Sequence, residues 1–169
     1  MPTTAKSASS TARRASAPAK PTRSRQSNAI TMLREDHKKV AGLFEDYEKA
    51  RSTNVKRRLV EQICLELTVH TTLEEEIFYP AFKQAARDKE LVPEAKVEHD
   101  SVKNLIAQVQ GKEPDGEDFD AKVKVMGEFV KHHVKEEQNE MFPKAKEAGL
   151  DLAELGRQMA ERKLQLMAH

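Results

Sequence analysis

Apolar residues recur every three or four positions through most of the chain after residue 29, which is the spacing of one face of an α-helix. Four such stripes follow one another: Ile30, Leu33, His37, Val40, Phe44 and Tyr47; Val55, Leu59, Ile63, Leu67, His70, Glu74 and Ile77; Ala95, His99, Val102, Ile106 and Val109; Phe119, Val123, Met126, Val130, His133 and Glu137. No segment shows the alternation of a β-strand. The pattern predicts an all-α fold, an up-down-up-down antiparallel four-helix bundle.

Turn and cap residues separate the predicted helices. Thr53-Asn54 precedes the second helix. The third follows Pro93 and ends at Gly111, and the turn GKEPDGED precedes the fourth. A last amphipathic segment, DLAELGRQMAERKLQLM, predicts a short C-terminal helix on the outside of the bundle. The expected domains are therefore a bundle at residues 30–148 and a C-terminal helical extension at residues 149–169.

Residues 1–29 differ in composition from the rest of the chain. They contain six basic residues and no acidic ones, a charge of +6, whereas the whole chain has a net charge of +1. No large apolar side chain follows Met1 in this stretch, so it cannot bury enough surface to offset the entropy of ordering. We expect a disordered basic tail. Its role stays open between weak, salt-sensitive contact with nucleic acid, an organelle transit peptide and a solubilising tail.

Composition excludes several classes of protein. The chain has no apolar run near the ~18 residues of a membrane span, so no membrane association is expected. The single cysteine, Cys64, excludes an internal disulfide bond and a CxxC motif, and its apolar neighbours predict a buried thiol. The N-terminus lacks the apolar segment of a secretory signal, which leaves the cytoplasm as the expected location.

A histidine interrupts each of the four predicted helical faces, and in two of them a glutamate follows one turn later. Two of the histidines lie near the starts of the first and third helices, and two near the ends of the second and fourth. These helix ends are neighbours in an antiparallel bundle, so the side chains are expected to meet in one layer at one end of the core. The predicted layer contains His37, His70, Glu74, His99, His133 and Glu137.

These six side chains are predicted to bind metal. Burying two carboxylates costs several kcal/mol unless a cation compensates them, and no lysine or arginine occupies the four stripes. Six nitrogen and oxygen donors are too many for a structural zinc ion and too rich in nitrogen for calcium or magnesium. Two metal ions would fit, each with two histidines, both glutamates bridging, a shared oxo or hydroxo group and one open position.

The same residues resemble the hemerythrin-like (HHE cation-binding) family. The resemblance rests on His37 in the first helix, HTTLE in the second, EHD in the third and HHVKE in the fourth, and it covers about residues 28–148. It implies a non-haem di-iron site, with two iron ions as the cofactor, in a four-helix bundle. Members of the family bind dioxygen or act in iron storage, iron sensing, defence against nitric oxide and peroxide, or repair of iron–sulfur centres.

The chain departs from the oxygen carriers of that family at two positions. Those proteins have a second histidine in the third helix where Lys103 stands, and an aspartate where Gln138 stands. We therefore expect binding of iron and of dioxygen or a related small oxidant (peroxide, nitric oxide), in oxygen or iron handling or stress defence, rather than reversible oxygen transport. Whether the chain is an enzyme stays open, with peroxide or nitric oxide reactivity as a secondary activity. The alternative is a metal-stabilised structural or regulatory module that associates with nucleic acid through residues 1–29.

Several residues beside the predicted layer have two interpretations. His132 and Tyr79 either join the site or belong to the surface and the core. Glu75 and Glu140 are expected on the solvated face. Residues that flank the predicted ligands are expected to orient imidazole rings as hydrogen-bond acceptors; they are Asp36, Glu98 and Asp100.

Overall fold

The computed structural model describes residues 27–169, so the predicted basic tail, apart from its last three residues, lies outside the described part of the chain. The described residues form helices and contain no β-strand, which confirms the predicted fold class. The long helices are α1 (Ala29–Lys49), α2 (Thr53–Leu73), α4 (Leu91–Val109) and α5 (Gly116–Glu136). Two π-helical turns, η1 (Glu74–Phe78) and η2 (Glu137–Met141), lead into the shorter helices α3 (Tyr79–Ala86) and α6 (Phe142–Glu147), and α7 (Leu152–Met167) follows.

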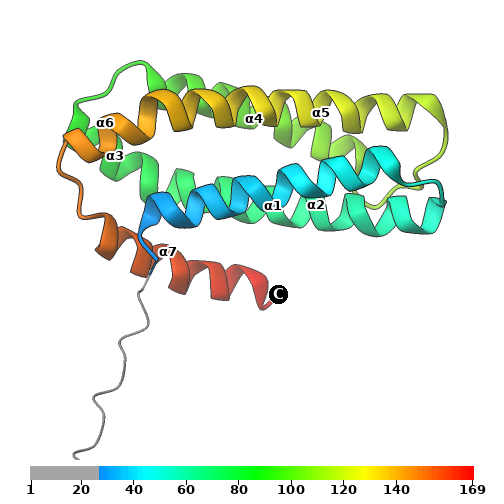
Figure 1. Cartoon of the computed structure of the whole chain (residues 1–169), viewed down its shortest axis with the longest axis horizontal. Helices are drawn as coiled ribbons and strands as arrows, with labels where there is room; N and C mark the ends of the chain where they lie inside the picture. The colour runs from blue at the N-terminus through cyan, green and yellow to red at the C-terminus, as the bar shows by residue number, and fades with distance from the viewer. Residues whose placement is uncertain (1–26) are drawn as a thin grey trace, which may run out of the picture.

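The four long helices form the predicted antiparallel bundle (Figure 1). α1 packs along α2, and α4 packs along α5, while α7 lies on the outside of α1 and α2. α3 and α6 extend α2 and α5 at the same end of the bundle, which is the end where α1 begins. None of the helices between residues 27 and 169 has both the length and the apolarity needed to cross a bilayer.

α4 begins upstream of its predicted start. It starts at Leu91, whereas the sequence pattern placed the start after Pro93. The Asp88 carboxylate accepts hydrogen bonds from the backbone N–H groups of Leu91 and Val92, and this contact caps the helix. Pro93 then occupies the first turn, where its missing N–H leaves no helical hydrogen bond unmade. The other end of α4 leads into the turn at Gly111, whose φ of +71° suits glycine.

The π-turn η1 changes the phase of the buried face at the end of α2. The predicted stripe ran through Ile77, but the structure buries Phe78 and Tyr79 completely and leaves Ile77 half-buried. The N–H of Tyr79 bonds to the carbonyl of Glu74, five residues back, instead of the usual four. Because of this wider turn, Tyr79 returns to the same side of the helix as Glu74, where a regular α-helix would not place it.

A proline follows each of the two π-turns. Pro80 and Pro143 lie in the first turns of α3 and α6. A proline has no N–H to donate, and its ring collides with the carbonyl four residues back, so a regular α-helix cannot continue through it. In η2 the N–H of Phe142 bonds to the carbonyl of Glu137, which repeats the pattern of η1. The extra residue of each π-turn thus accommodates the proline that follows.

Apolar clusters lie on both sides of the histidine layer. One cluster, which includes Leu33 and Phe142, fills the end of the bundle where α3, α6 and α7 meet α1. The other fills the opposite end and includes Val40, Cys64 and Met126. Cys64 is fully buried, as predicted, and burial raises the pKa of its thiol to about 11. The predicted position of the layer, at one end of the core, was therefore wrong, because the residues of α3, α6 and α7 add a second cluster beyond it.

Candidate metal centre

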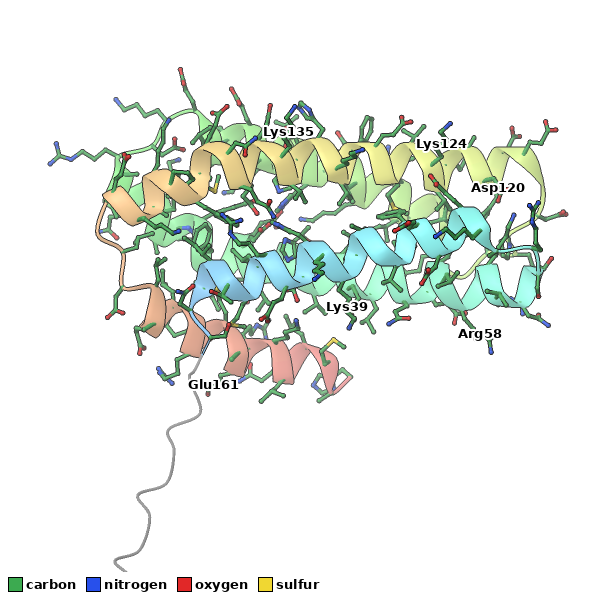
Figure 2. The ribbon with its side chains drawn as sticks, in the orientation of Figure 1. Lys39, Arg58, Asp120, Lys124, Lys135 and Glu161 are labelled. Atoms are coloured by element: carbon green, nitrogen blue, oxygen red, sulfur yellow. The ribbon has the colours of Figure 1, made fainter. Side chains whose placement is uncertain are left out.

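The bundle brings all six predicted metal ligands together in its interior. Each long helix contributes one histidine and each π-turn contributes its first residue, so the set is His37, His70, Glu74, His99, His133 and Glu137. None of the six is more than 7% exposed. Side-chain nitrogen and oxygen atoms gather between the helices in this part of the bundle, whereas Lys135 lies on the outer side of α5 (Figure 2). π-turns are frequent at functional sites, and here each one begins with a buried glutamate.

Two histidines and one oxygen of each glutamate form the first half of the centre, which we call the His37 half. The Nε2 atoms of His37 and His70 lie 3.1 Å apart. Oε1 of Glu137 lies 3.0 Å from Nε2 of His37, and Oε1 of Glu74 lies 3.0 Å from Nε2 of His70. One ion could contact all four of these residues, since their donor atoms lie within 4.8 Å of one another.

The other two histidines and the second oxygen of each glutamate form the His99 half. The Nε2 atoms of His99 and His133 lie 3.2 Å apart. Oε2 of Glu74 lies 3.0 Å from Nε2 of His99, and Oε2 of Glu137 lies 3.4 Å from Nε2 of His133. Each carboxylate therefore turns one oxygen toward each half, which is the arrangement that bridging ligands require.

The Tyr79 hydroxyl lies inside the His99 half. It is 2.7 Å from Oε2 of Glu137 and 3.0 Å from Oε2 of Glu74, and it can donate its proton to one of them at a time. The Nε2 atoms of His99 and His133 are 3.2 and 3.3 Å away. Burial and the two carboxylate charges hold the pKa of Tyr79 well above its usual range, so the phenol stays neutral. The sequence left Tyr79 undecided because the helical period does not reveal the π-turn.

The chemistry of the donor set fits a metal centre. A carboxylate only accepts hydrogen bonds, so the histidines that contact outer carboxylates through Nδ1 carry a proton there and turn Nε2 toward the centre. Oε1 of Glu74 and Oε1 of Glu137 are buried, yet neither accepts a hydrogen bond from any described residue. Burial lowers the pKa of His70, but the Glu74 charge and the Asp36 contact outweigh it and raise that pKa to about 10. Positive charge is therefore favoured at this centre, and a transition-metal ion would supply it.

Each histidine of the centre is held from outside through its Nδ1 atom. Three partners are carboxylates and one is an amide: Asp36 Oδ2 lies 3.3 Å from His70, Glu75 Oε1 lies 2.9 Å from His99, Glu98 Oε2 lies 2.5 Å from His133, and Gln138 Nε2 lies 3.0 Å from His37. The three carboxylates accept from Nδ1, fix the orientation of their imidazole rings and increase the basicity of these rings as ligands, whereas the Gln138 amide fixes only the orientation of His37. The four rings are thus oriented before any ion binds.

The sequence predicted these outer partners only in part. Asp36 and Glu98 do orient imidazoles, although each contacts the histidine of the neighbouring helix rather than the one beside it in sequence. The prediction for Asp100 was wrong, since it is exposed to solvent. The solvated position expected for Glu75 was also wrong, because Glu75 bonds to a buried histidine. His132 does not join the layer, and its side chain is 65% exposed.

A small apolar cavity adjoins the layer on the side away from the π-turns. Its volume is about 20 Å³, and all four histidines of the layer line it together with Asp36, Val40, Leu67, Thr71, Val102, Val130 and Val134. A groove of about 840 Å³ between α1 and α5 shares His37, Val130 and Val134 with this cavity. Of the four histidines, only His37 reaches the groove. The surface and the histidine layer are therefore separated by few side chains on this face.

Known proteins share both the sequence pattern and the fold. The model of the family described as Hemerythrin HHE cation binding domain matches residues 28–145. The crystal structure of a hemerythrin HHE cation binding domain-containing protein from Mycobacterium kansasii superposes with a TM-score of 0.73 at 26% identity, covering 83% of this chain and 88% of that one.

Two curated relatives are similar over part of their length. A protein named DNA nickase from Nostoc sp. is 27% identical over 115 residues, which make up 68% of this chain and 32% of that protein. An uncharacterized hemerythrin-like protein of Schizosaccharomyces pombe is 24% identical over 110 residues, 64% of this chain and 54% of that one. The chain thus spans about a third and about half of these two relatives. Since the family match covers most of the chain, the chain belongs to the hemerythrin HHE cation binding domain family.

Proposed function

We propose that the chain is a non-haem di-iron protein that binds iron and dioxygen or a related small oxidant, peroxide or nitric oxide, in oxygen or iron handling or stress defence. The observation that carries the proposal is the pair of buried glutamates, Glu74 and Glu137, whose oxygens each face a histidine Nε2 atom. One ion would meet two nitrogens and two carboxylate oxygens from His37, His70, Glu74 and Glu137, and the other would meet His99, His133 and Glu74. Oε2 of Glu137 lies 3.4 Å from Nε2 of His133 and completes the second set. Mixed nitrogen and oxygen donors suit first-row transition ions such as iron.

The cavity beside the layer supports a small ligand as the second component. A volume of about 20 Å³ admits about one water-sized molecule. Aliphatic side chains such as Val102 and Val130 favour an uncharged guest and exclude bulk water. Iron, when bound, supplies redox chemistry toward dioxygen, peroxide or nitric oxide. Tyr79 contributes a neutral hydroxyl whose proton is held against the carboxylates.

Elemental analysis tests the proposal. The purified chain is reconstituted with ferrous iron in the absence of air and its metals are counted. We expect two tightly bound irons per chain, one for each half, and a lower count in His99→Ala. Dioxygen, nitric oxide and peroxide are then added, and each ligand that binds should change the absorption spectrum of the iron-loaded chain. A single zinc ion, or no iron, would contradict the di-iron assignment and favour a structural role for the layer.

Peroxide turnover is proposed as a secondary activity. The layer contains no separate general acid beyond the buried, neutral Tyr79. We therefore expect slow peroxide breakdown compared with ligand binding. Rapid breakdown by the iron-loaded chain that disappears in His70→Ala would place catalysis first.

Association with DNA is a second candidate function, which the similarity to the Nostoc protein named DNA nickase favours. The basic residues of the N-terminal segment carry a charge of +6, which would give salt-sensitive, sequence-independent contact with phosphates. Deletion of residues 1–26 should abolish DNA binding at low salt and leave the iron content unchanged. If the full chain does not bind DNA at low salt, this candidate fails.

A further inference from the structure

Three of the four side chains that hold the histidines from outside are carboxylates, and two of these are paired with lysines. Lys163 Nζ lies 2.6 Å from Asp36, and Lys103 Nζ lies 2.8 Å from Glu75. Glu98, the third carboxylate, differs: among residues 27–169 no lysine or arginine forms an ion pair with it. The compensating cation that the other two carboxylates have is therefore missing at Glu98.

A histidine and a second carboxylate face Glu98 instead. His132 and Glu136, one turn apart on α5, place Nε2 and Oε1 3.1 Å from each other. The same Nε2 atom lies 3.8 Å from Oε1 of Glu98. One nitrogen and two carboxylate oxygens thus lie within 4.8 Å of one another. Ligand atoms at ~2.0–2.2 Å from a common ion are at most about 4.4 Å apart, so a small side-chain movement closes this set around an ion.

We propose that Glu98, His132 and Glu136 form a third metal site, on the surface, for a divalent first-row transition cation. One imidazole and two carboxylates suit an ion such as Fe²⁺ and leave its remaining positions to water. The ion compensates Glu98 as lysines compensate Asp36 and Glu75. Because the His132 side chain is 65% exposed, the ion exchanges readily with solvent.

A small cavity borders two residues of the surface site, Glu98 and Glu136, and two of the buried centre, His133 and Glu137. Its volume is about 10 Å³, and Glu94, Leu91, Ala95 and Met141 complete its lining. Glu98 takes part in both sites, because Oε1 faces the surface histidine while Oε2 accepts a hydrogen bond from Nδ1 of His133. We infer that the surface site loads Fe²⁺ into the His99 half past the carboxylates that border this cavity. The loading role rests on the proposed di-iron function.

Metal stoichiometry tests the surface site. The metal-free full chain is dialysed without air against increasing Fe²⁺, and bound iron is counted. We expect three ions per chain, two tight and one weak, and two in the His132→Ala/Glu136→Gln double variant. Glu98 is left unchanged because it holds a buried histidine in place. A wild-type chain that binds no weak ion, or a double variant that keeps the weak ion, overturns the proposal.

The rate of iron uptake tests the loading path. Stopped-flow mixing with limiting Fe²⁺ should show uptake about tenfold slower in the double variant, because a surface site of opposite charge concentrates the cation near the path. Asp100→Asn serves as the control, since it removes an exposed charge from α4 without altering the three proposed ligands. Equal uptake rates in the wild type and the double variant overturn the loading path.

His99→Ala separates this proposal from the di-iron proposal. That variant should lose buried iron and keep the weak surface ion, whereas the double variant should show the reverse. If the wild-type chain binds only a weak ion that the double substitution removes, the di-iron function fails and the surface site stands. If the wild-type chain binds two tight ions and the folded double variant, with unchanged helical circular dichroism, binds none, an independent surface site is excluded.

Discussion

The first half of the bundle, α1 to α3, and the second half, α4 to α6, place the same kinds of residue at equivalent points. In each half, one histidine lies in the first helix, and a His-x-x-x-Glu pair leads into a π-turn, an aromatic residue and a proline. Asp36 in the first half and Glu98 in the second each accept a hydrogen bond from the second histidine of their own half. The frame of the centre is therefore an approximate twofold repeat.

The two halves differ at two equivalent positions that contact the centre. The residue after the bridging glutamate is Glu75 in one half and Gln138 in the other, so His99 has an anionic partner and His37 has a neutral one. The aromatic residue after the π-turn is Tyr79 in one half and Phe142 in the other. Tyr79 directs its hydroxyl to the carboxylates, whereas the Phe142 ring stacks on His37 with centroids 6.0 Å apart. A symmetric frame thus holds two chemically different positions.

The largest expected effect comes from removing a bridging carboxylate. In the wild type, iron at a thousandfold excess over its Kd should stabilise the fold by about 4 kcal/mol, and Glu74→Gln should remove most of that gain. Glu137→Gln should cost less, because Glu74 lies within 4 Å of three histidine Nε2 atoms and Glu137 of two. Urea unfolding with ferrous iron and with chelator measures both variants.

The two glutamates also provide the control for that experiment. With chelator present, both variants should unfold close to the metal-free wild type or be more stable than it, since each removes a buried charge. Equal stability of the wild type with iron and with chelator would contradict a six-residue metal centre.

Removal of the Tyr79 hydroxyl should have the next largest effect. Without metal, Tyr79→Phe removes the single hydroxyl proton that Oε2 of Glu74 or of Glu137 accepts, which costs about 1–3 kcal/mol. Iron should reduce this cost, because it takes over the compensation of the carboxylates. Tyr47→Phe is the matched control: its hydroxyl donates to Asp120, a half-exposed carboxylate at the far end of the bundle, so the loss should be smaller and independent of iron. A Tyr79→Phe loss that does not change with iron would separate Tyr79 from the centre.

The helical period was sufficient to predict the bundle and the meeting of the six side chains. Histidines on four stripes at matching depth can converge only if the helices are antiparallel, and the structure has them so. Tyr79 was out of reach of the same reasoning, because an α-helical period carries the buried face to Ile77 and a π-turn carries it to Phe78 and Tyr79. The signal was present in Pro80, whose ring cannot follow a regular helical turn.

The outer partners of the histidines were harder to predict than the centre itself. Asp36 contacts His70 across a helix interface, so sequence adjacency to His37 pointed to the wrong ring. Lys163 pairs with Asp36 from 127 residues further along the chain, in α7, and no local pattern links the two. Polar contacts between helices depend on how each helix is rotated and shifted along its axis relative to its neighbours. The four apolar stripes indicate which residues face the core, but they do not indicate which polar side chains at the edges of that face meet.

Changing the residues that contact Nδ1 of His37 and of His99 should alter metal affinity, with a smaller effect than the two substitutions above. Glu75→Gln replaces the anionic acceptor of His99 by an amide and should weaken binding in the His99 half about tenfold. Gln138→Glu should strengthen binding in the His37 half, because an anionic acceptor makes His37 a better ligand. Competition titration with a chromophoric chelator resolves the two affinities. Affinities that change in the same direction in both variants would contradict the assignment of these residues to separate halves.

The smallest expected effect concerns Gly127, which lies six residues before His133 and lines the groove. Its equivalent in the first half, six residues before His70, is the fully buried Cys64. Gly127→Ala should gain roughly 0.5–1 kcal/mol from the helix, less the cost of a Cβ 3.1 Å from the Phe44 ring. That ring can shift into the groove of about 840 Å³, so a gain of a few tenths should remain. Gly42→Ala, whose Cβ would meet nothing within 4 Å, should show the full gain in the same urea titration. If Gly127→Ala destabilises the chain while Gly42→Ala stabilises it, the Phe44 ring is fixed, and the groove beside His37 is rigid.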